Sequence, residues 1–413
     1  MAGAIAALAA REAGASVLLA RRGPGGTALS GGAVGVAPDA GAPSTVPFAL
    51  RLRPMEAARR LAALRPAHPY AIAGVGRLAE ALDFAARALP GLLAPFEDRS
   101  RFLVTAGGGV AECGLCQRSQ VAGDLALARG LVAAVGFRGH LGFDARPWAA
   151  AVAGMAAAGA PPSAWAEAEL FGGPEEGTLA PHELARALER PGAAEAAGAA
   201  VRAVLPAGAA VALLPPVLGL DPAVRVLERL AAAAGVPVAE TLADVPSVPG
   251  LRLQAALEAR LAAAGVELVS GKVELGGWPR RPLLVAGQER EARAVVLASG
   301  RFVGGGLVRH GELREALLGL PVEATVGGES GTRLAGRPAP SLTRPERRAP
   351  QPLLAAGLRV DAAMRPLGES GQPAHPRLFA AGAVIGGYEN AADGTGLGAA
   401  ILTGYLAGKA AAG

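Results

Sequence analysis

The chain has 413 residues, 51% of them hydrophobic, which is enough for two or more domains and a large buried core. Its formal net charge is +5, but lysine occurs only at Lys272 and Lys409, and the remaining cations are arginines spread along the sequence. Because no Lys/Arg-rich run or basic stripe with interleaved aromatics is present, we expect no nucleic-acid partner. Two cysteines in so long a chain argue against a secreted disulfide scaffold.

No segment predicts a membrane anchor or a leader for secretion. The apolar stretch over residues 2–10 is short and runs directly into charged residues. The uncharged stretch over residues 203–220 contains three prolines, which favours a buried strand with a loop over a membrane helix. We therefore expect a cytoplasmic protein with no transmembrane segment of its own, able to dock on a membrane partner.

The first elements are a helix over residues 2–13 and an apolar strand over residues 16–20. In dinucleotide-binding folds a strand and a G-x-G-x-x-G turn precede such a helix, and Gly3 stands where the last of these glycines belongs. The following strand normally ends in an acid that accepts hydrogen bonds from ribose hydroxyls, but here Ala20 is followed by Arg21. Arginine cannot accept those bonds, which weakens the case for an adenosine ribose.

A small-residue loop, Ser30-Gly31-Gly32, could let the backbone approach the ring of a ligand; a plain loop is the alternative. Further on, His68 precedes a proline, which favours an extended backbone and can direct the imidazole into a cleft. Its role could be acid–base chemistry or anion contact, or it could be a turn histidine with no chemistry.

A C-x-x-C pair, Cys113 and Cys116, can be redox-active or can supply half of a metal site. No second pair and no histidine at ligand spacing lies nearby. We therefore interpret both residues as buried or incidental thiols and predict no metal site.

The middle of the chain alternates apolar strands with alanine-rich helices, which predicts an inserted α/β substrate or cap domain. The predicted strands cover residues 131–137, 211–214 and 236–239, and the predicted helices cover residues 183–190 and 221–234. The predicted domains are a discontinuous first domain (1–50, 245–322 and 374–413), an inserted domain (51–244) and a connecting excursion (323–373).

The last third returns to the pattern of the first domain. A helix over residues 251–264 is followed by strands over residues 266–269 and 294–300, the second ending in Ser299-Gly300. The tail adds a short strand near residue 380, a glycine turn and a small-residue helix, with glycines at Gly382, Gly386, Gly387, Gly396 and Gly398. Free backbone N–H groups and a helix N-terminus in such a place favour a carbonyl oxygen or an anion.

The tail resembles the closing motif of flavoproteins of the fumarate reductase type, in which the turn and the helix N-terminus face the flavin ring. Residues 65–70, 245–271, 296–322 and the tail also resemble, in the same order and spacing, the B subunit of anaerobic glycerol-3-phosphate dehydrogenase. The most specific part is Ser299-Gly300 followed by Gly305-Gly306-Leu307 and by Arg314-Glu315. On this basis the predicted fold is a Rossmann-like flavin-binding domain, discontinuous and without its first strand, with an inserted α/β domain.

The resemblance implies a flavoprotein that carries FMN, pairs with an FAD-bearing subunit of the same dehydrogenase and docks on its membrane-associated iron–sulfur subunit. The complex would oxidise sn-glycerol 3-phosphate to dihydroxyacetone phosphate, pass electrons to the quinone pool and lie peripherally on the inner membrane. The missing acid after Ala20 would permit FMN, and an FAD held by other contacts stays open.

If this chain carries out the chemistry, we expect His68 to act as the base and Arg301 and Arg314 to contact the substrate anion. An alternative is a non-catalytic assembly or electron-relay subunit with little flavin affinity, which the non-acidic Ala20 and Ala383 favour. A stand-alone flavin-dependent reductase of the fumarate or ketosteroid type ranks lowest, because no dense His/Arg set for a dicarboxylate is present.

Two further expectations concern geometry. The pocket should lie between the lobes, lined by Ser30, Gly31, Gly300 and Gly386. The first helix should lack its partner strand, leaving a strand-sized gap beside residues 17–20 that an upstream, apolar extension of about ten residues ending in glycines would fill, restoring flavin binding. A segment of this chain occupying that gap would contradict the hypothesis.

Overall fold

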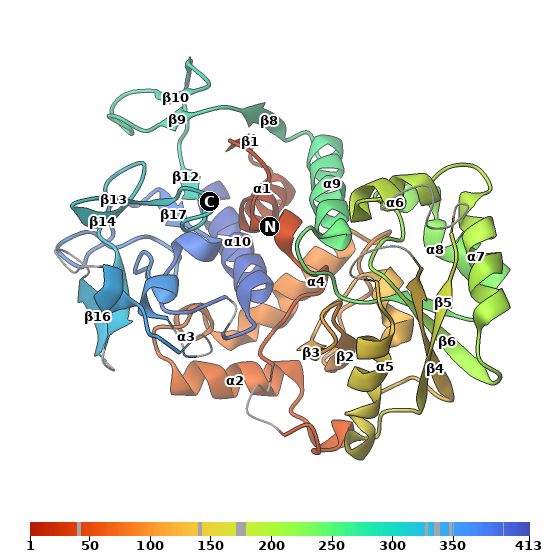
Figure 1. Ribbon diagram of the computed structural model, residues 1–413. Coiled ribbons are helices and arrows are strands. Elements are labelled where there is room, and N and C mark those ends of the chain that lie inside the picture. The colour runs from red at the N-terminus through yellow and green to blue at the C-terminus, as the bar shows by residue number, and fades with distance from the viewer. Residues whose placement is uncertain are drawn as a thin grey trace.

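The computed structural model describes residues 1–38, 43–138, 143–170, 179–326, 329–333, 339–346, 349, 351–390 and 392–413, which form a mixed α/β molecule (Figure 1). The described α-helices are α1 (Ala2–Glu12), α2 (Pro54–Leu64), α3 (Pro69–Ala73), α4 (Leu78–Ala88), α5 (Arg146–Ala153), α6 (Pro181–Leu188), α7 (Ala193–Val204), α8 (Val226–Ala234), α9 (Val248–Ala263) and α10 (Gly396–Ala412). The described strands are β1 (Leu18–Arg21), β2 (Arg101–Val104), β3 (Val110–Cys113), β4 (Leu131–Phe137), β5 (Ser163–Ala168), β6 (Ala209–Leu214), β7 (Val238–Glu240), β8 (Glu267–Ser270), β9 (Val273–Glu274), β10 (Leu283–Val285), β11 (Gln288–Arg290), β12 (Val295–Leu297), β13 (Leu307–His310), β14 (Glu312–Glu315), β15 (Glu323–Val326), β16 (Glu329–Arg333) and β17 (Leu378–Ala380).

Helices from the two ends of the chain lie side by side at the centre of the molecule (Figure 1). Helix α10 is built almost entirely from Ala, Gly, Leu and Ile, and most of its residues are buried. Its glycines allow backbone-to-backbone contact with α1: a Cβ on Gly404 would lie 2.5 Å from the carbonyl oxygen of Ala2. The predicted helices at the start and end of the chain are thus confirmed, and together they form one packing unit.

Two short parallel ladders flank these helices. Strand β1 pairs with β8, and strand β12 pairs with β17, so segments from the start, the last third and the tail of the chain meet here. Within the described residues, β1 and β12 each have a single ladder partner. This arrangement agrees with a mixed α/β, Rossmann-like core. The predicted gap beside residues 17–20 stays a prediction.

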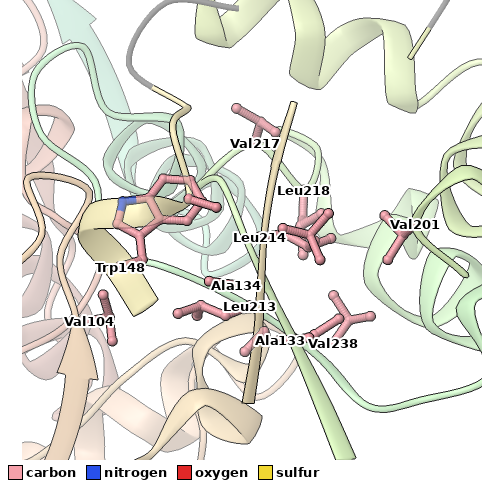
Figure 2. Packing of buried hydrophobic residues seen from close by; sticks show 14 of the residues in the cluster. Val104, Ala133, Ala134, Trp148, Val201, Leu213, Leu214, Val217, Leu218 and Val238 are labelled. Atoms are coloured by element: carbon pink, nitrogen blue, oxygen red, sulfur yellow. The ribbon is translucent and has the colours of Figure 1, made fainter. Parts of the chain in front are cut away.

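A second lobe, whose buried cluster extends from Phe102 to Val248, contains a four-stranded parallel sheet in the order β5-β4-β6-β7. Strand β4 is buried along nearly its whole length, as expected for a parallel strand covered on both faces by helices. Figure 2 shows the core of this lobe, where Trp148 packs near Val104, Ala134 and Leu213. The buried indole also donates a hydrogen bond from Nε1 to the carbonyl oxygen of Ala106, at 2.8 Å. The sequence-predicted strands of this region are confirmed, and β5 is an addition to them.

Helices α2, α3 and α4 do not join the second lobe, although the inserted domain was predicted to begin at residue 51. Ala58, Leu78 and Leu82 are buried in the same cluster as Ile5 and Leu402 of α1 and α10. The buried cluster of the second lobe begins only at Phe102. An amphipathic pattern shows that a helix has an apolar face but not which neighbour covers it, so the structure differs from the predicted border.

Smaller antiparallel pieces complete the described structure. Strands β9, β10 and β11 form one sheet, while β13 with β14 and β15 with β16 form hairpins (Figure 1). The predicted connecting excursion over residues 323–373 contains the last hairpin, and part of that range lies outside the described residues. Among the described helices, none has both the length and the apolar character needed to cross a membrane.

Candidate functional site

The N-terminus of α1 sits against the ends of strands β12 and β17. A Cβ on Gly3 would lie 3.2 Å from the Cβ of Ala298, which directly follows β12. Gly382, which has φ +72°, lies so close to Ala2 that an added Cβ would be 2.6 Å from the Ala2 side chain. The Gly382 N–H donates to Thr403 Oγ1 of α10 at 2.8 Å. The predicted positions Gly3 and Gly382 therefore lie in one place, where glycine permits the close approach.

Two side chains from other parts of the chain bind carbonyl oxygens of the Ser30-Gly31-Gly32 loop. Ser247 Oγ donates to the Ser30 carbonyl at 2.5 Å, and Gln120 Nε2 donates to the Gly31 carbonyl at 3.0 Å. Within the described part of the chain, the N–H groups of Gly31 and Gly32 have no hydrogen-bond partner. The loop can therefore offer two backbone donors to a ligand.

The turn after β12 carries Ser299 and Gly300, and Gly300 adopts φ +75°. The hydroxyl oxygen of Ser299 is buried and has no partner among the described residues, as expected for a group that awaits a ligand or water. The next residue, Arg301, donates from Nη2 to the carbonyl oxygens of Ile385 and Tyr388, at 3.1 and 3.2 Å. Gly300 and Gly386 therefore lie on the same side of the molecule, as the predicted arrangement requires.

Gly386 and Gly387 line a cleft of about 290 Å³ beside this turn. Gly387 has φ +86° and lies directly against the carbonyl oxygen of Ala67. At the cleft the Arg359 guanidinium lies 3.7 Å from the Glu323 carboxylate. Of the four residues predicted to line one pocket, Gly386 is the one that lines this cleft, and Ser30, Gly31 and Gly300 do not. The four residues therefore do not line this cleft together.

Helix α10 begins at Gly396 without a side-chain cap. The first turn of any α-helix leaves N–H groups without a partner inside the helix, and these favour an anion or a carbonyl oxygen. Gly398 leaves room for the Tyr70 hydroxyl and for the Gly35 carbonyl, which lie where a Cβ would be. Gly398 is therefore buried against Tyr70 and Gly35, and the half-buried Gly396 stands at the start of the helix.

His68 is completely buried, and both ring nitrogens are engaged. Nδ1 accepts a hydrogen bond from the Tyr70 N–H at 3.0 Å, so His68 caps α3, and Nε2 lies 3.2 Å from Thr395 Oγ1. Burial, with a smaller effect from Arg65, lowers the pKa of His68 to about 3, so the ring is neutral at physiological pH. Because Nδ1 is an acceptor, the proton sits on Nε2 and points to Thr395. This geometry favours a structural role over the predicted role as a base.

The two predicted anion contacts are also committed to protein groups. Arg301 is buried, its pKa is lowered by that burial, and its Nη groups bind carbonyl oxygens that include that of Leu354. Its buried Nε has no partner among the described residues. Arg314 lies on β14, where its guanidinium pairs with Glu312 at 2.7 Å and with Glu369 at 2.6 Å. Arg301 therefore joins loops, and the charge of Arg314 is compensated locally.

The cysteine pair is packed into a small apolar cluster with Leu103 and Leu242. Both thiols are free, and burial raises the pKa of Cys116 to about 12 and that of Cys113 well above its ordinary value. Their thiols stay protonated at neutral pH, which supports the interpretation as packing residues. Among the described residues, no group of three His, Cys, Asp or Glu side chains has metal-site geometry.

Comparison with known proteins identifies the family of this chain. A model of the FAD binding domain family matches residues 1–398. The probable B subunit of anaerobic glycerol-3-phosphate dehydrogenase from Halobacterium salinarum is 30% identical over all of this chain and 96% of its own length. The chain belongs to the B-subunit family of anaerobic glycerol-3-phosphate dehydrogenases. Partial matches include the B subunits of Pectobacterium carotovorum (30% identity, 53% of this chain and 50% of that protein) and of Yersinia pestis (31%, 46% and 44%).

In this member of the B-subunit family, strand β1 ends in Arg21, where dinucleotide-binding folds usually have an acid. Arg21 makes a two-pronged ion pair with Glu258 of α9, and this pair lowers the pKa of Glu258. Gln254 donates to the same carboxylate at 2.6 Å. Since both Glu258 oxygens accept bonds from protein groups, Glu258 does not replace the acid that is missing after Ala20.

Two residues of the site were not identified from the sequence. Thr27 is buried at the start of α1, where its Oγ1 accepts a hydrogen bond from the Met1 amine at 2.5 Å. Thr27 follows the pair Gly25-Gly26 and lies three residues before the predicted loop. A polar residue in this position was the signal that could have identified it. Gln120 gave no signal, because its partner Gly31 is 89 residues away.

Proposed function

We propose that this chain is the flavin-containing B subunit of an anaerobic glycerol-3-phosphate dehydrogenase. The complex would oxidise sn-glycerol 3-phosphate to dihydroxyacetone phosphate and pass the electrons to the quinone pool. The observation that carries this proposal is the full-length likeness to the Halobacterium salinarum protein.

The residues gathered around α1 fit a flavin. The first turns of α1 and α10 can face the phosphate and ring oxygens, the Gly31 and Gly32 N–H groups supply unpaired donors, and the Ser299 hydroxyl lacks a partner among the described residues. When bound, a flavin accepts the two electrons released by carbinol oxidation. The FAD binding family model favours FAD over the FMN that the sequence resemblance implied.

The proposed partners are the FAD-bearing subunit of the dehydrogenase and its iron–sulfur subunit. The relatives are named as one lettered subunit of a dehydrogenase, which supports membership of a complex with several chains. The iron–sulfur subunit would hold the complex on the inner face of the membrane, since no described helix of this chain could do so by crossing it.

The test uses the co-purified complex and the isolated chain. We expect both to show a flavin absorption spectrum, and mass analysis of the chromophore released by denaturation to identify FAD. Anaerobic addition of glycerol 3-phosphate should bleach the complex, whereas fumarate and other dicarboxylates should have no effect. A full-length chain that stays colourless after reconstitution with FAD and FMN would contradict the proposal.

A second candidate is an assembly or electron-relay subunit with weak flavin binding. The structural roles of His68 and Arg301 favour it, because both ring nitrogens of His68 and the Nη groups of Arg301 are bonded to protein groups. Turnover measured with the FAD-bearing and iron–sulfur subunits alone, and then with this chain added, separates the two. A catalytic role for this chain predicts no glycerol 3-phosphate oxidation by the pair.

A further inference from the structure

We infer that Gln120 and Ser247 are positioning residues for the flavin, because they fix the direction of the Gly31 and Gly32 N–H groups, which have no partner among the described residues. The inference rests on the proposed function and extends it to residues outside the glycine motifs. Both side chains are buried, and each bonds a carbonyl oxygen of the loop.

The orientation of these donors follows from peptide geometry. In a trans peptide unit the C=O of one residue and the N–H of the next point in opposite directions. Ser247 Oγ holds the Ser30 carbonyl at 2.5 Å, so the Gly31 N–H must point away from Ser247. Gln120 Nε2 holds the Gly31 carbonyl at 3.0 Å, so the Gly32 N–H must point away from Gln120. The Ala243 N–H adds a longer bond, of 3.3 Å, to the Gly31 carbonyl. Two side-chain bonds, with this backbone bond beside the second, thus orient two donors.

The loop is closely packed at Gly32. Gly32 adopts φ +96°, and a Cβ there would lie 2.6 Å from Pro249 and 2.7 Å from Gln120 Nε2. Ser247 is itself fixed, since it caps α9 by accepting the Gly250 N–H at 2.9 Å. The loop is therefore clamped between the start of α9 and the Gln120 side chain.

Gln120 is held in turn by a buried polar network. Its Oε1 accepts the N–H of Gln117 at 3.1 Å, and Gln117 Oε1 accepts a bond from Arg252 Nη1 at 2.9 Å. The same nitrogen of Arg252 lies 2.6 Å from Glu240 Oε1, at the end of β7. All four of these residues are at most 3% exposed. The second lobe thereby supports the loop through this chain of hydrogen bonds.

Oriented N–H donors beside a ring that gains negative charge on reduction favour its reduced form. We expect Gln120→Met, which keeps the side-chain length but removes the donor, to weaken flavin binding about tenfold, the effect of one lost hydrogen bond. The midpoint potential of the bound flavin should become more negative. Ser247→Ala should act in the same direction.

The variants are compared with Ser163→Ala, which removes another hydroxyl-to-carbonyl bond, of 2.8 Å, in the second lobe. Ser247→Thr keeps a hydroxyl and should restore the potential and affinity, which a purely structural role would not require. A second measurement needs no flavin: amide hydrogen exchange of the 28–36 segment in the flavin-free chain. Gln120→Met and Ser247→Ala should speed it, while Ser163→Ala should not.

The outcomes separate this inference from the proposed function. If flavin affinity, potential and exchange of the segment all match the Ser163→Ala control, the positioning role is wrong even though flavin binds. If the wild-type chain binds no flavin, the proposed function and the flavin part of the inference both fail. Faster exchange in Gln120→Met would then show that the clamp on the loop is real.

Discussion

Gly408 of α10 lies against the carbonyl oxygen of Ala6 on α1, so closely that a Cβ at position 408 would overlap that oxygen. One helical turn earlier, Gly404 meets the carbonyl of Ala2 in the same way. The two helices come from opposite ends of the chain and pack backbone to backbone. This contact places the N-terminus of α1 beside the ends of β12 and β17, so the geometry of the candidate site depends on it.

The first prediction follows from this contact. Gly408→Ala should lower the free energy of unfolding by about 1–3 kcal/mol, the usual cost of overpacking a core. On helix propensity alone, the same change would stabilise an exposed helix by about 1 kcal/mol. The sign of the change in unfolding free energy therefore shows whether close packing or helix propensity dominates. Urea denaturation followed by circular dichroism measures the difference.

Gly276→Ala is the matched control, because an added Cβ there meets nothing within 4 Å and no left-handed φ is involved. It should leave the unfolding free energy nearly unchanged. Equal stability of Gly408→Ala and wild type would show that α1 and α10 can separate without loss, contrary to the packing described.

The second prediction concerns the pH dependence of stability. The pKa of His68 is about 3 in the folded chain, against about 6.5 for an exposed histidine, so the unfolded chain binds a proton that the folded chain excludes. Stability should therefore fall as the pH drops from about 6.5 toward 3, by up to about 1.4 kcal/mol per pH unit. Above pH 6.5 this group contributes no slope.

His68→Asn removes the titration but keeps a side-chain oxygen that can accept the Tyr70 N–H and cap α3. Between about pH 7.5 and 5, wild type should lose about 2 kcal/mol more than the variant. The comparison uses urea unfolding curves at several pH values. Parallel curves would mean that His68 is not buried as a neutral ring.

The third prediction concerns the buried Arg252–Glu240 pair. Glu240→Ala should destabilise the chain by about 3–5 kcal/mol, because it leaves the Arg252 charge buried without its partner. Replacing both residues by Met should cost less than the single change, since no charge then remains in the core. The exposed pair of Arg229 and Glu195, 2.7 Å apart, is the control, and Glu195→Ala should have a much smaller effect. Thermal and urea unfolding test the order of these variants.

The fourth prediction concerns Cys113 and Cys116. Their raised pKa values and burial keep both thiols protonated and inaccessible, so a disulfide reagent at about pH 8 should label neither in the folded chain. Both should react rapidly in denaturant. Labelling of either thiol at the rate of a free peptide thiol would reveal a reactive site that the structure does not show.

Local pattern was sufficient for the elements whose periodicity is strong. Strand β4 is a continuous apolar run, α9 alternates apolar and charged residues with helical spacing, and α10 is an uninterrupted small-residue segment. Each of these could be predicted because hydrophobic spacing and glycine or proline punctuation act over a few residues. The glycines at positions 3, 382 and 386 could be proposed for the same reason, since close backbone approach requires glycine.

What depends on partners distant in sequence could not be predicted in this way. The predicted border at residue 51 assigned α4 to the inserted domain, but in the folded chain its buried residues pack with α10 and not with the second lobe. His68 was predicted to be a base and Arg301 an anion contact, because the sequence shows the type of a side chain but not its burial or its hydrogen-bond partners. Burial makes the histidine neutral, and the carbonyl oxygens of residues 354, 385 and 388 accept hydrogen bonds from the Nη groups of Arg301.

The sequence by itself determined the family and the strongly periodic helices and strands, and it indicated the glycines of the candidate site. The tertiary structure decided which of the described groups remain free to bind a ligand, among them the N–H groups of Gly31 and Gly32, the Ser299 hydroxyl and the Arg301 Nε. The physical reason is that a polar group's availability depends on the hydrogen bonds made by its neighbours. The bond from Gln120 to Gly31 joins residues 89 positions apart, a distance over which no local pattern extends.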